Sequence, residues 1–290
     1  MLTDLYVYIN DESKRSSIIN KVRGKEQEEY IRRAKELWRP YQPSPRSHEK
    51  TIGIDSSWNY KEFRGFYLLA VAGIAISDEG EVVGKEVSVE AGLPLIEEGG
   101  SQYPDPDLYL ESMGMEYEAK LVESSADLGR VLVDGSIIRR FYDRANRRKI
   151  LYAEYLRNVL KRSGTVFVSK SSVSRELVRG IWSDIYYFQK ADSSPGFSES
   201  ESIPSLNVSY FYARLVDHGP VLRIEIVGGH IDEKEIQDLM DVLYSRQFKG
   251  YPYALRLAHE RCTITNKDID ALVRDLGLHV EVLARDVLEA

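Results

Sequence analysis

The 290-residue sequence has one cysteine, Cys262, and this single thiol sets two limits. It cannot form a disulfide within the chain, and no cluster of cysteines is present to hold zinc. Disulfides are rare in reducing compartments. We therefore expect a cytoplasmic protein that is stabilised by a packed core.

Long apolar runs are missing too. The stretch FYLLAVAGIAI, residues 66–76, is shorter than the roughly 20 residues that a helix needs to cross a bilayer, and it is typical of a buried strand. The opening stretch, MLTDLYVYINDESKR, lacks the basic start and apolar core of a signal peptide. We expect no membrane partner.

The sequence also has no excess of positive charge, because its formal net charge is −7. A protein coated in positive potential is excluded, although a local basic groove for nucleic acid can coexist with an acidic exterior. An acidic balance suits a site for divalent cations, with simple solubility as the commoner explanation.

Hydrophobic spacing predicts the secondary structure. We expect helices over residues 11–39, 108–125, 136–163, 174–191 (with Ser174 as N-cap), 232–246, 252–262 and 266–276. Strands are predicted at residues 51–57, 65–76, 81–90, 130–136, 165–172, 206–216 and 221–229. The proline-rich residues 39–48 are predicted to be a linker, and residues 91–107 and 192–205 to be loops.

Three strands followed by alternating helices and strands predict an α/β fold, with a mixed sheet and helices against its faces. Acids on the first strand, the first helix and the fourth strand match the layout of the ribonuclease H-like fold. We therefore divide the chain in two. Residues 1–48 form an N-terminal helical extension and linker, and residues 49–290 form a ribonuclease H-like domain with C-terminal β/α additions.

Two aspartates follow apolar strands: Asp55 in TIGIDSSWN and Asp134 in VLVDGSI. Two divalent ions roughly 4 Å apart can cleave a phosphodiester, and Mg²⁺ and Mn²⁺ prefer hard oxygen ligands. Gly135 would let the backbone turn closely past such a site. One aspartate at a strand end is more often a cap or a turn residue, but two with an acidic helix between them favour a metal site.

The third ligand is expected from that helix, ESMGMEYEAKL, residues 111–121. Glu116 and Glu118 lie roughly 200° apart around a helix, so they cannot both face the sheet. Glu118 shares a face with Met115 and Leu121, which favours Glu118, and Glu116 stays open as the alternative.

Three stretches together resemble the NurA nuclease family of archaea and some bacteria. They are IGIDSSWN followed by GFYLLAVAGIAI, EYEAKLVESSADLGRVLVDGSI, and GYPYALRLAHE at residues 250–260. The family's first motif is often Asp-Gly-Ser, whereas Ser56 follows Asp55 here.

The resemblance implies that Asp55, Asp134 and one of the two glutamates bind metal, and that Tyr251 and His259 complete the catalytic site. His259 could be a further metal ligand, a general acid or an imidazolium bound to phosphate. Tyr253, two residues from Tyr251, could serve in its place.

The resemblance also implies an activity. The family's members are Mn²⁺-dependent deoxyribonucleases that act as dimers, and Mg²⁺ is an alternative cofactor. The resemblance implies 5′–3′ exonuclease activity, with single-strand endonuclease activity beside it, although the residues themselves do not fix the polarity. It further implies pairing with the HerA hexameric translocase and a role in DNA-end resection for homologous recombination.

Several side chains are candidates for contacts with DNA. Lys170, at the end of the strand TVFVSK, could hold a phosphate, and Trp58 beside Asp55 could stack on a base. A basic stretch after Asp134 could follow a DNA backbone through Arg139, Arg140, Arg144, Arg147 and Arg148. The competing interpretations are a solvated lysine, core packing of the indole and a solvated helix face.

Two other functions compete with a nuclease. The first is a non-catalytic adaptor that docks on a DNA translocase. The second is an ATP-dependent kinase or ATPase of the actin-like group, since GIDSS resembles its first phosphate loop. Such loops need a glycine directly after the aspartate so that backbone amides can approach phosphate, and this chain has Ser56 there.

Overall fold

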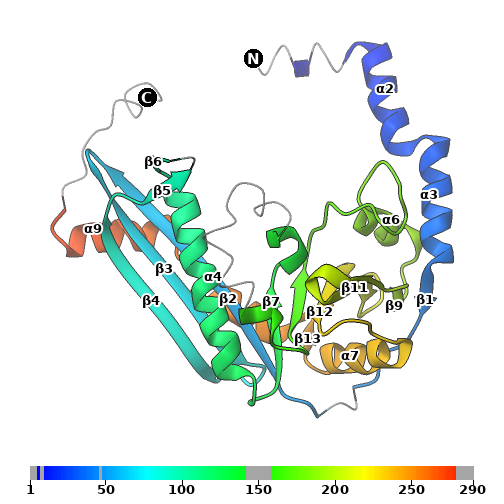
Figure 1. Ribbon diagram of the computed structural model, residues 1–290. Coiled ribbons are helices and arrows are strands. Elements are labelled where there is room, and N and C mark those ends of the chain that lie inside the picture. The colour runs from blue at the N-terminus through cyan, green and yellow to red at the C-terminus, as the bar shows by residue number, and fades with distance from the viewer. Residues whose placement is uncertain (1–4, 7–9, 46–47, 99, 142–157, 279–290) are drawn as a thin grey trace.

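The computed structural model describes residues 5–6, 10–45, 48–98, 100–141 and 158–278, and its main feature is a ten-stranded sheet (Figure 1). The strands are β1 (Trp38–Pro40), β2 (Thr51–Phe63), β3 (Phe66–Ser77), β4 (Val82–Gly92), β7 (Arg130–Asp134), β8 (Val166–Ser169), β9 (Gly196–Ser198), β10 (Glu201–Ile203), β11 (Val208–Arg214) and β12 (Leu222–Val227). Their spatial order is β1, β9, β11, β12, β8, β7, β2, β3, β4, and β10 pairs with β11.

The strands β4, β3, β2, β7 and β8 form the ribonuclease H-like half of this sheet. β2, β3 and β4 are antiparallel neighbours, whereas β7 runs parallel to both β2 and β8. Parallel neighbours need a crossover, which helix α4 (Pro106–Ser125) supplies between β4 and β7. The predicted mixed α/β fold of the ribonuclease H-like type is therefore confirmed.

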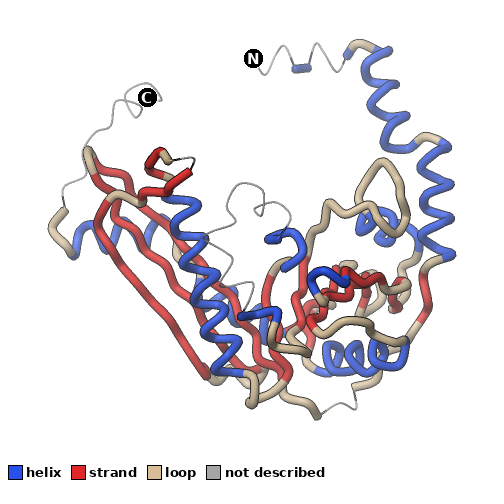
Figure 2. Tube along the Cα trace, viewed as in Figure 1, coloured by secondary structure: helices blue, strands red, loops and turns tan. Residues whose placement is uncertain are grey.

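Helices cover both faces of the sheet (Figure 2). On one face α4 packs on β2 and β3. On the other face lie α7 (Glu233–Ser245) and α8 (Tyr253–Cys262), and α9 (Asn266–Asp275) contacts β2. Successive residues of a strand enter opposite layers, so Val133 packs in the core that includes α4 and Leu132 in the core that includes α7. The three C-terminal helices begin and end within two residues of the predicted positions.

Two helices, α2 (Glu12–Arg23) and α3 (Lys25–Glu36), stand where one helix was predicted. The break falls at Gly24, whose backbone is extended and whose amide donates to the Asn20 carbonyl oxygen. Residues 38–40 were predicted to lie in the helix end and linker, but they form β1, which pairs with β9 at the sheet edge. The division of the chain at residue 48 stays a prediction.

Four other segments differ from the prediction. The predicted loop 91–107 contains the hairpin β5 (Leu95–Glu98) and β6 (Ser101–Pro104), and the loop 192–205 contains β9, β10 and the 3₁₀ turn η1 (Pro204–Leu206). A second small hairpin joins β13 (Gln247–Phe248) to β14 (Tyr251–Pro252). Of the helix predicted over 174–191, only α6 (Asp184–Ala191) forms.

The chain before α6 is irregular because the buried Asp184 carboxylate accepts hydrogen bonds from the amides of Leu177 and Val178. Ser174 is therefore not the N-cap, and Ser183 takes that position. Of the helix predicted over 136–163, residues 137–141 and 158–160 are helical, and residues 142–157 lie outside the described part of the chain. Among the described helices, none combines the length and the apolar character that crossing a membrane requires.

Candidate metal centre

Asp55 and Asp134 lie side by side because of the register between β2 and β7. These parallel strands pair Ile54 with Val133, and the next residue of each strand is an aspartate. Neighbouring residues of paired strands point to the same face, here the face that α8 covers. The prediction that Asp55 ends a strand is wrong, because β2 continues to Phe63. It is β7 that ends, so the two acids meet where the pairing of the strands stops.

Helix α8 brings His259 to the same point. Gly53 lets α8 cross β2 closely, since a Cβ atom there would lie 2.3 Å from the Ala254 carbonyl carbon. From Ala254 to His259 the helix rises about 7.5 Å, and from Gly53 to Asp55 the strand rises about 6.6 Å. His259 therefore lies level with Asp55. The His259 Nδ1 atom lies 2.9 Å from Asp55 Oδ2.

These three side chains form a compact set of ligand atoms. One ligand atom from each of Asp55, Asp134 and His259 lies within 4.8 Å of the other two. Burial raises the pKa of the Asp55 carboxyl to about 6, the charges of Asp134 and Glu118 add to the rise, and the bond to His259 opposes it. The charged form of Asp55 is therefore disfavoured by its burial first and by its acidic neighbours second, a combination that is common at functional sites.

Glu118 lies next to this set and is 1% exposed. Its Oε1 atom accepts a hydrogen bond from Ser56 Oγ at 2.6 Å, and the Ser56 amide donates to Asp55 Oδ1 at 2.9 Å. Ser56, which stands where the resemblance implied a frequent glycine, therefore links the two acids. The alternative, Glu116, is not brought to the cluster: it is exposed and pairs with Lys120 at 2.8 Å.

Lys170 and Tyr251 border the cluster on the β8 side. The Lys170 ammonium lies 3.0 Å from Asp134 Oδ2 and 4.6 Å from the centre of the Tyr251 ring. Within the described part of the chain the buried Tyr251 hydroxyl has no hydrogen-bond partner. Burial, followed by the charge of Asp134, raises the Tyr251 pKa, so the hydroxyl stays protonated at neutral pH. Tyr253, the alternative, begins helix α8.

The other residues predicted to contact DNA differ in their exposure to solvent. Trp58 is half-buried and packs with Leu110 and Tyr117 of α4, which favours core packing. Arg139 is exposed, whereas Arg140 turns inward to Glu118. Arg144, Arg147 and Arg148 lie outside the described residues.

Glu225 and Ser136 support the site and were not predicted. Glu225, on β12, is fully buried and accepts hydrogen bonds from Ser136 Oγ at 2.6 Å and from the Ile138 amide at 3.0 Å. These bonds hold the turn after Asp134, where Gly135 has a φ of +102°. The sequence pattern that could have indicated Glu225 is the strand LRIEIV, in which Arg223 and Glu225 lie two residues apart and so point to the same buried face.

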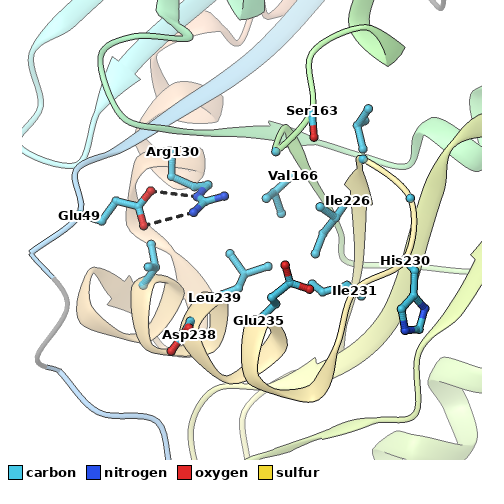
Figure 3. A pocket seen from close by; sticks show the side chains of 15 residues that line it. Glu49, Arg130, Ser163, Val166, Ile226, His230, Ile231, Glu235, Asp238 and Leu239 are labelled. Carbon is cyan, nitrogen blue, oxygen red and sulfur yellow. Dashed lines mark hydrogen bonds and ion pairs between the residues drawn. The ribbon is translucent and has the colours of Figure 1, made fainter.

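A separate cavity of about 290 Å³ opens at the other end of β7 and β8 (Figure 3). Val166, Ile226 and Leu239 line it, and the Glu49 carboxylate accepts a hydrogen bond from Arg130 Nε at 3.0 Å at its side. Asp134 ends β7 and Arg130 begins it, so this cavity is distinct from the acid cluster.

The acid cluster fits a divalent ion of the Mn²⁺ type. Two carboxylates and an imidazole are ligands that such ions accept, and Glu118 offers a third carboxylate close by. The Tyr251 hydroxyl adds a buried donor that has no partner within the described chain. The residues present therefore suit the bound metal that the resemblance implied.

Known proteins are similar to this chain in sequence and in fold. The model of the NurA domain family matches residues 49–264. The DNA double-strand break repair nuclease NurA of Saccharolobus solfataricus (strain ATCC 35092 / DSM 1617 / JCM 11322 / P2) is 29% identical over 147 residues. That match covers 44% of this chain and only 41% of the relative's length.

Solved structures agree with this. The crystal structure of the NurA nuclease from Sulfolobus solfataricus has a TM-score of 0.77 and 19% identity, and the alignment covers 95% of both chains. A crystal structure of NurA bound to dAMP and manganese has a TM-score of 0.66 and 12% identity, covering 96% of this chain and 98% of that one. Because the family model spans most of the sequence, this chain belongs to the NurA family.

Proposed function

We propose that this chain is a metal-dependent nuclease that hydrolyses phosphodiester bonds at DNA ends. The observation that carries the proposal is the convergence of Asp55, Asp134 and His259, with ligand atoms within 4.8 Å of one another. The buried Glu118 beside them supplies further negative charge. Phosphodiester hydrolysis is a reaction that carboxylate-bound divalent ions catalyse well.

Asp55, Asp134 and His259 would hold a Mn²⁺ ion, with Mg²⁺ as the alternative, and Glu118 would contribute to a second cation subsite. When bound, such an ion polarises the phosphate and lowers the pKa of water. The role of the protein is to keep these ligands in place, through the register of β2 and β7 and the close crossing of α8.

The neighbouring side chains would bind the substrate. The half-exposed Lys170 ammonium is a point charge suited to a phosphate of the DNA. The Tyr251 hydroxyl would donate a hydrogen bond to a phosphate oxygen, which would give this buried group a partner.

The names of related proteins support the same substrate and cofactor. The curated relative is named a DNA double-strand break repair nuclease, and a solved NurA structure contains dAMP and manganese. We extend the proposal to 5′–3′ exonuclease activity with single-strand endonuclease activity, a homodimer, a HerA-type hexameric translocase as partner, and end resection in homologous recombination. These finer points rest on the resemblance of the sequence motifs.

The test is incubation of the purified chain with DNA labelled at the 5′ or the 3′ end, in Mn²⁺, Mg²⁺ or EDTA. We expect cleavage with Mn²⁺, none in EDTA, and none with an Asp134→Ala variant that keeps the circular dichroism spectrum of the wild type. The labelled end that is released first gives the polarity. Intact DNA under every condition would contradict the enzyme assignment and favour the adaptor that docks on a translocase.

A further inference from the structure

Arg140 forms a bidentate ion pair with the candidate metal ligand Glu118. Its Nη1 atom lies 2.5 Å from Glu118 Oε2, and its Nη2 atom lies 3.3 Å from Oε1. The same Nη2 atom donates to the Asp134 carbonyl oxygen at 3.1 Å. The guanidinium thus joins the helix acid to the strand that carries Asp134.

This pairing uses most of what Glu118 can offer. A carboxylate has about four acceptor positions, and Arg140 takes two of them while Ser56 takes a third at 2.6 Å. A buried carboxylate without a counter-charge is strongly disfavoured, so Arg140 supplies the positive charge that Glu118 requires. A cation could bind Glu118 fully only if this guanidinium moved away.

The arrangement is built into the backbone. Gly135 leaves room for the guanidinium, because a Cβ atom there would lie 3.2 Å from Arg140 Nη2. The short helix at 137–141 is fixed at its start by Glu225, which accepts from the Ile138 amide. The Arg140 side chain remains 18% exposed, so it has a route toward solvent.

The other candidate ligands are held more loosely. Asp134 also pairs with a protein cation, Lys170, at 3.0 Å, but that side chain is 49% exposed, whereas the Arg140 side chain is 18% exposed. The Arg140 guanidinium binds the Glu118 side chain and the main chain of Asp134, and the compact set of Asp55, Asp134 and His259 lies beside it. The site therefore offers two unequal places for a cation. At the compact set the protein cation is the half-exposed Lys170, and at Glu118 it is a mostly buried guanidinium that contacts both carboxylate oxygens.

We propose that Arg140 is an exchangeable counter-ion. It neutralises Glu118 in the metal-free protein and weakens cation binding at the Glu118 subsite. When a cation and DNA bind, its guanidinium moves from the carboxylate to a phosphate. A planar guanidinium binds both carboxylates and phosphates through two parallel hydrogen bonds, so the exchange replaces one partner of Arg140 with another of suitable geometry. This inference rests on the proposed nuclease function, since it requires a cation at the acid cluster.

The exchange couples the binding of DNA to the binding of a cation at Glu118. A phosphate that receives Arg140 frees Glu118 for a cation, and by reciprocity a cation at Glu118 frees Arg140 for DNA. The Glu118 subsite therefore binds a cation mainly when DNA is present, and in the DNA-free protein this subsite is mostly without one.

The experiment is a titration of the metal-free full chain with Mn²⁺, followed by the electron paramagnetic resonance signal of free Mn²⁺. We expect the wild type to show a tight site and a second site that is weaker by about tenfold or more. In Arg140→Gln the weaker site should tighten by about tenfold or more, because a charge-assisted bond to Glu118 no longer competes. The neighbouring exposed Arg139→Gln is the matched control and should leave both sites unchanged.

Further variants make the result specific. Glu118→Gln should remove the weaker site, and Arg140→Gln should then have no further effect. A phosphorothioate oligonucleotide, which resists cleavage, should tighten the weaker site in the wild type and not in Arg140→Gln. An unchanged weaker site in folded Arg140→Gln, or equal tightening in Arg139→Gln, would overturn the inference.

Two outcomes separate this inference from the proposed function. If the wild type binds no Mn²⁺ at all, the metal centre itself is contradicted. If the wild type binds Mn²⁺ and Arg140→Gln behaves like it, only the counter-ion role is lost. Should Arg140→Gln fail to fold, Arg140→Lys decides: a smaller tightening is expected, and no tightening would overturn the role.

Discussion

Two groups of buried charges lie in the same sheet and differ in how they are balanced. Glu225 is fully buried, its Oε1 atom lies 2.8 Å from Arg223 Nε, and it accepts hydrogen bonds from Ser136 and the Ile138 amide. Asp55 is nearly as buried, but two other carboxylates lie close and the pKa of its carboxyl rises to about 6. The buried acid of the first group has its own arginine. In the second group Lys170 pairs with Asp134 and Arg140 with Glu118, and Asp55 has the His259 imidazole beside it.

The difference teaches that burial alone does not show what an acid does. A buried acid with its own arginine holds structure together, and removing one partner leaves an uncompensated charge. A buried acid that repels its neighbours lowers the stability of the folded state, a disadvantage that proteins tolerate at functional sites. Substitutions in the two groups should therefore act on different quantities.

The largest expected effect is on catalysis at the acid cluster. Asp55→Asn keeps the shape of the side chain and removes its charge, so cation binding weakens. We expect DNA cleavage with Mn²⁺ to fall by about a thousandfold, which corresponds to about 4 kcal/mol of transition-state stabilisation. Initial rates on end-labelled DNA measure it, with the exposed Asp238→Asn as control. Cleavage within tenfold of the wild type would remove Asp55 from the chemistry.

The second effect concerns stability and belongs to the balanced pair. Glu225→Ala leaves Arg223 buried without its counter-charge and frees the Ser136 turn. We expect the free energy of unfolding to drop by about 3 kcal/mol, and the melting temperature by about 6 to 10 °C. Arg223→Met combined with Glu225→Gln should recover part of this loss. A melting temperature within 1 °C of the wild type in Glu225→Ala would mean the pair is not structural.

A smaller effect is expected at Lys170, which borders the cluster. Lys170→Gln removes the proposed phosphate partner without changing a candidate metal ligand, so the KM for DNA should rise by about tenfold, equivalent to about 1.4 kcal/mol. Steady-state kinetics separate KM from kcat. Lys85→Gln, at an exposed position on β4, is the control. Unchanged KM in Lys170→Gln would make this lysine an ordinary surface residue that pairs with Asp134.

The smallest effect is a gain of stability in a catalytically impaired variant. Without metal, Asp55→Asn should raise the free energy of unfolding at pH 7.5 by about 1 kcal/mol, and the melting temperature by about 2 °C, because it removes a buried charge that two other carboxylates repel.

This gain should depend on pH. The folded protein holds the Asp55 proton more tightly than the unfolded chain, since its pKa is about 6 instead of 3.8. The stability from this group is complete below about pH 4 and is lost as the pH rises through about 6. The advantage of Asp55→Asn should therefore shrink between pH 7.5 and pH 5. Calorimetry in EDTA measures it, and an advantage that grows toward low pH would contradict the assigned pKa.

Much of the fold could be predicted because its signals are local. The hairpin of β3 and β4 follows from apolar stretches around a short polar turn, and the C-terminal helices follow from their periodicity and caps. The strands β9 and β10 could not be predicted, since GFS and ESI are short and carry no alternation of their own. They are strands because the buried β11 pairs with both of them.

At the site, too, the residue types could be predicted from local sequence, whereas their arrangement could not. Residue type and motif order singled out Asp55, Asp134 and His259 and left Glu116 and Glu118 as alternatives; the structure brings Glu118 to the other three and leaves Glu116 exposed. The register that aligns Asp55 with Asp134 depends on pairing between strands about 80 residues apart, which no local pattern encodes. Arg140 belongs to a basic stretch that indicates a solvated or DNA-binding face, yet the anchored turn at Ser136 directs it to Glu118.

The most direct test of the central claim is an anomalous difference map at the manganese edge, from crystals of the wild-type chain grown with Mn²⁺. We predict a peak in contact with the carboxylates of Asp55 and Asp134 and the imidazole of His259, with no such peak in crystals of Asp55→Asn. A wild-type map without density at that position, while Asp134 still pairs with Lys170 and Asp55 with His259, would contradict the account.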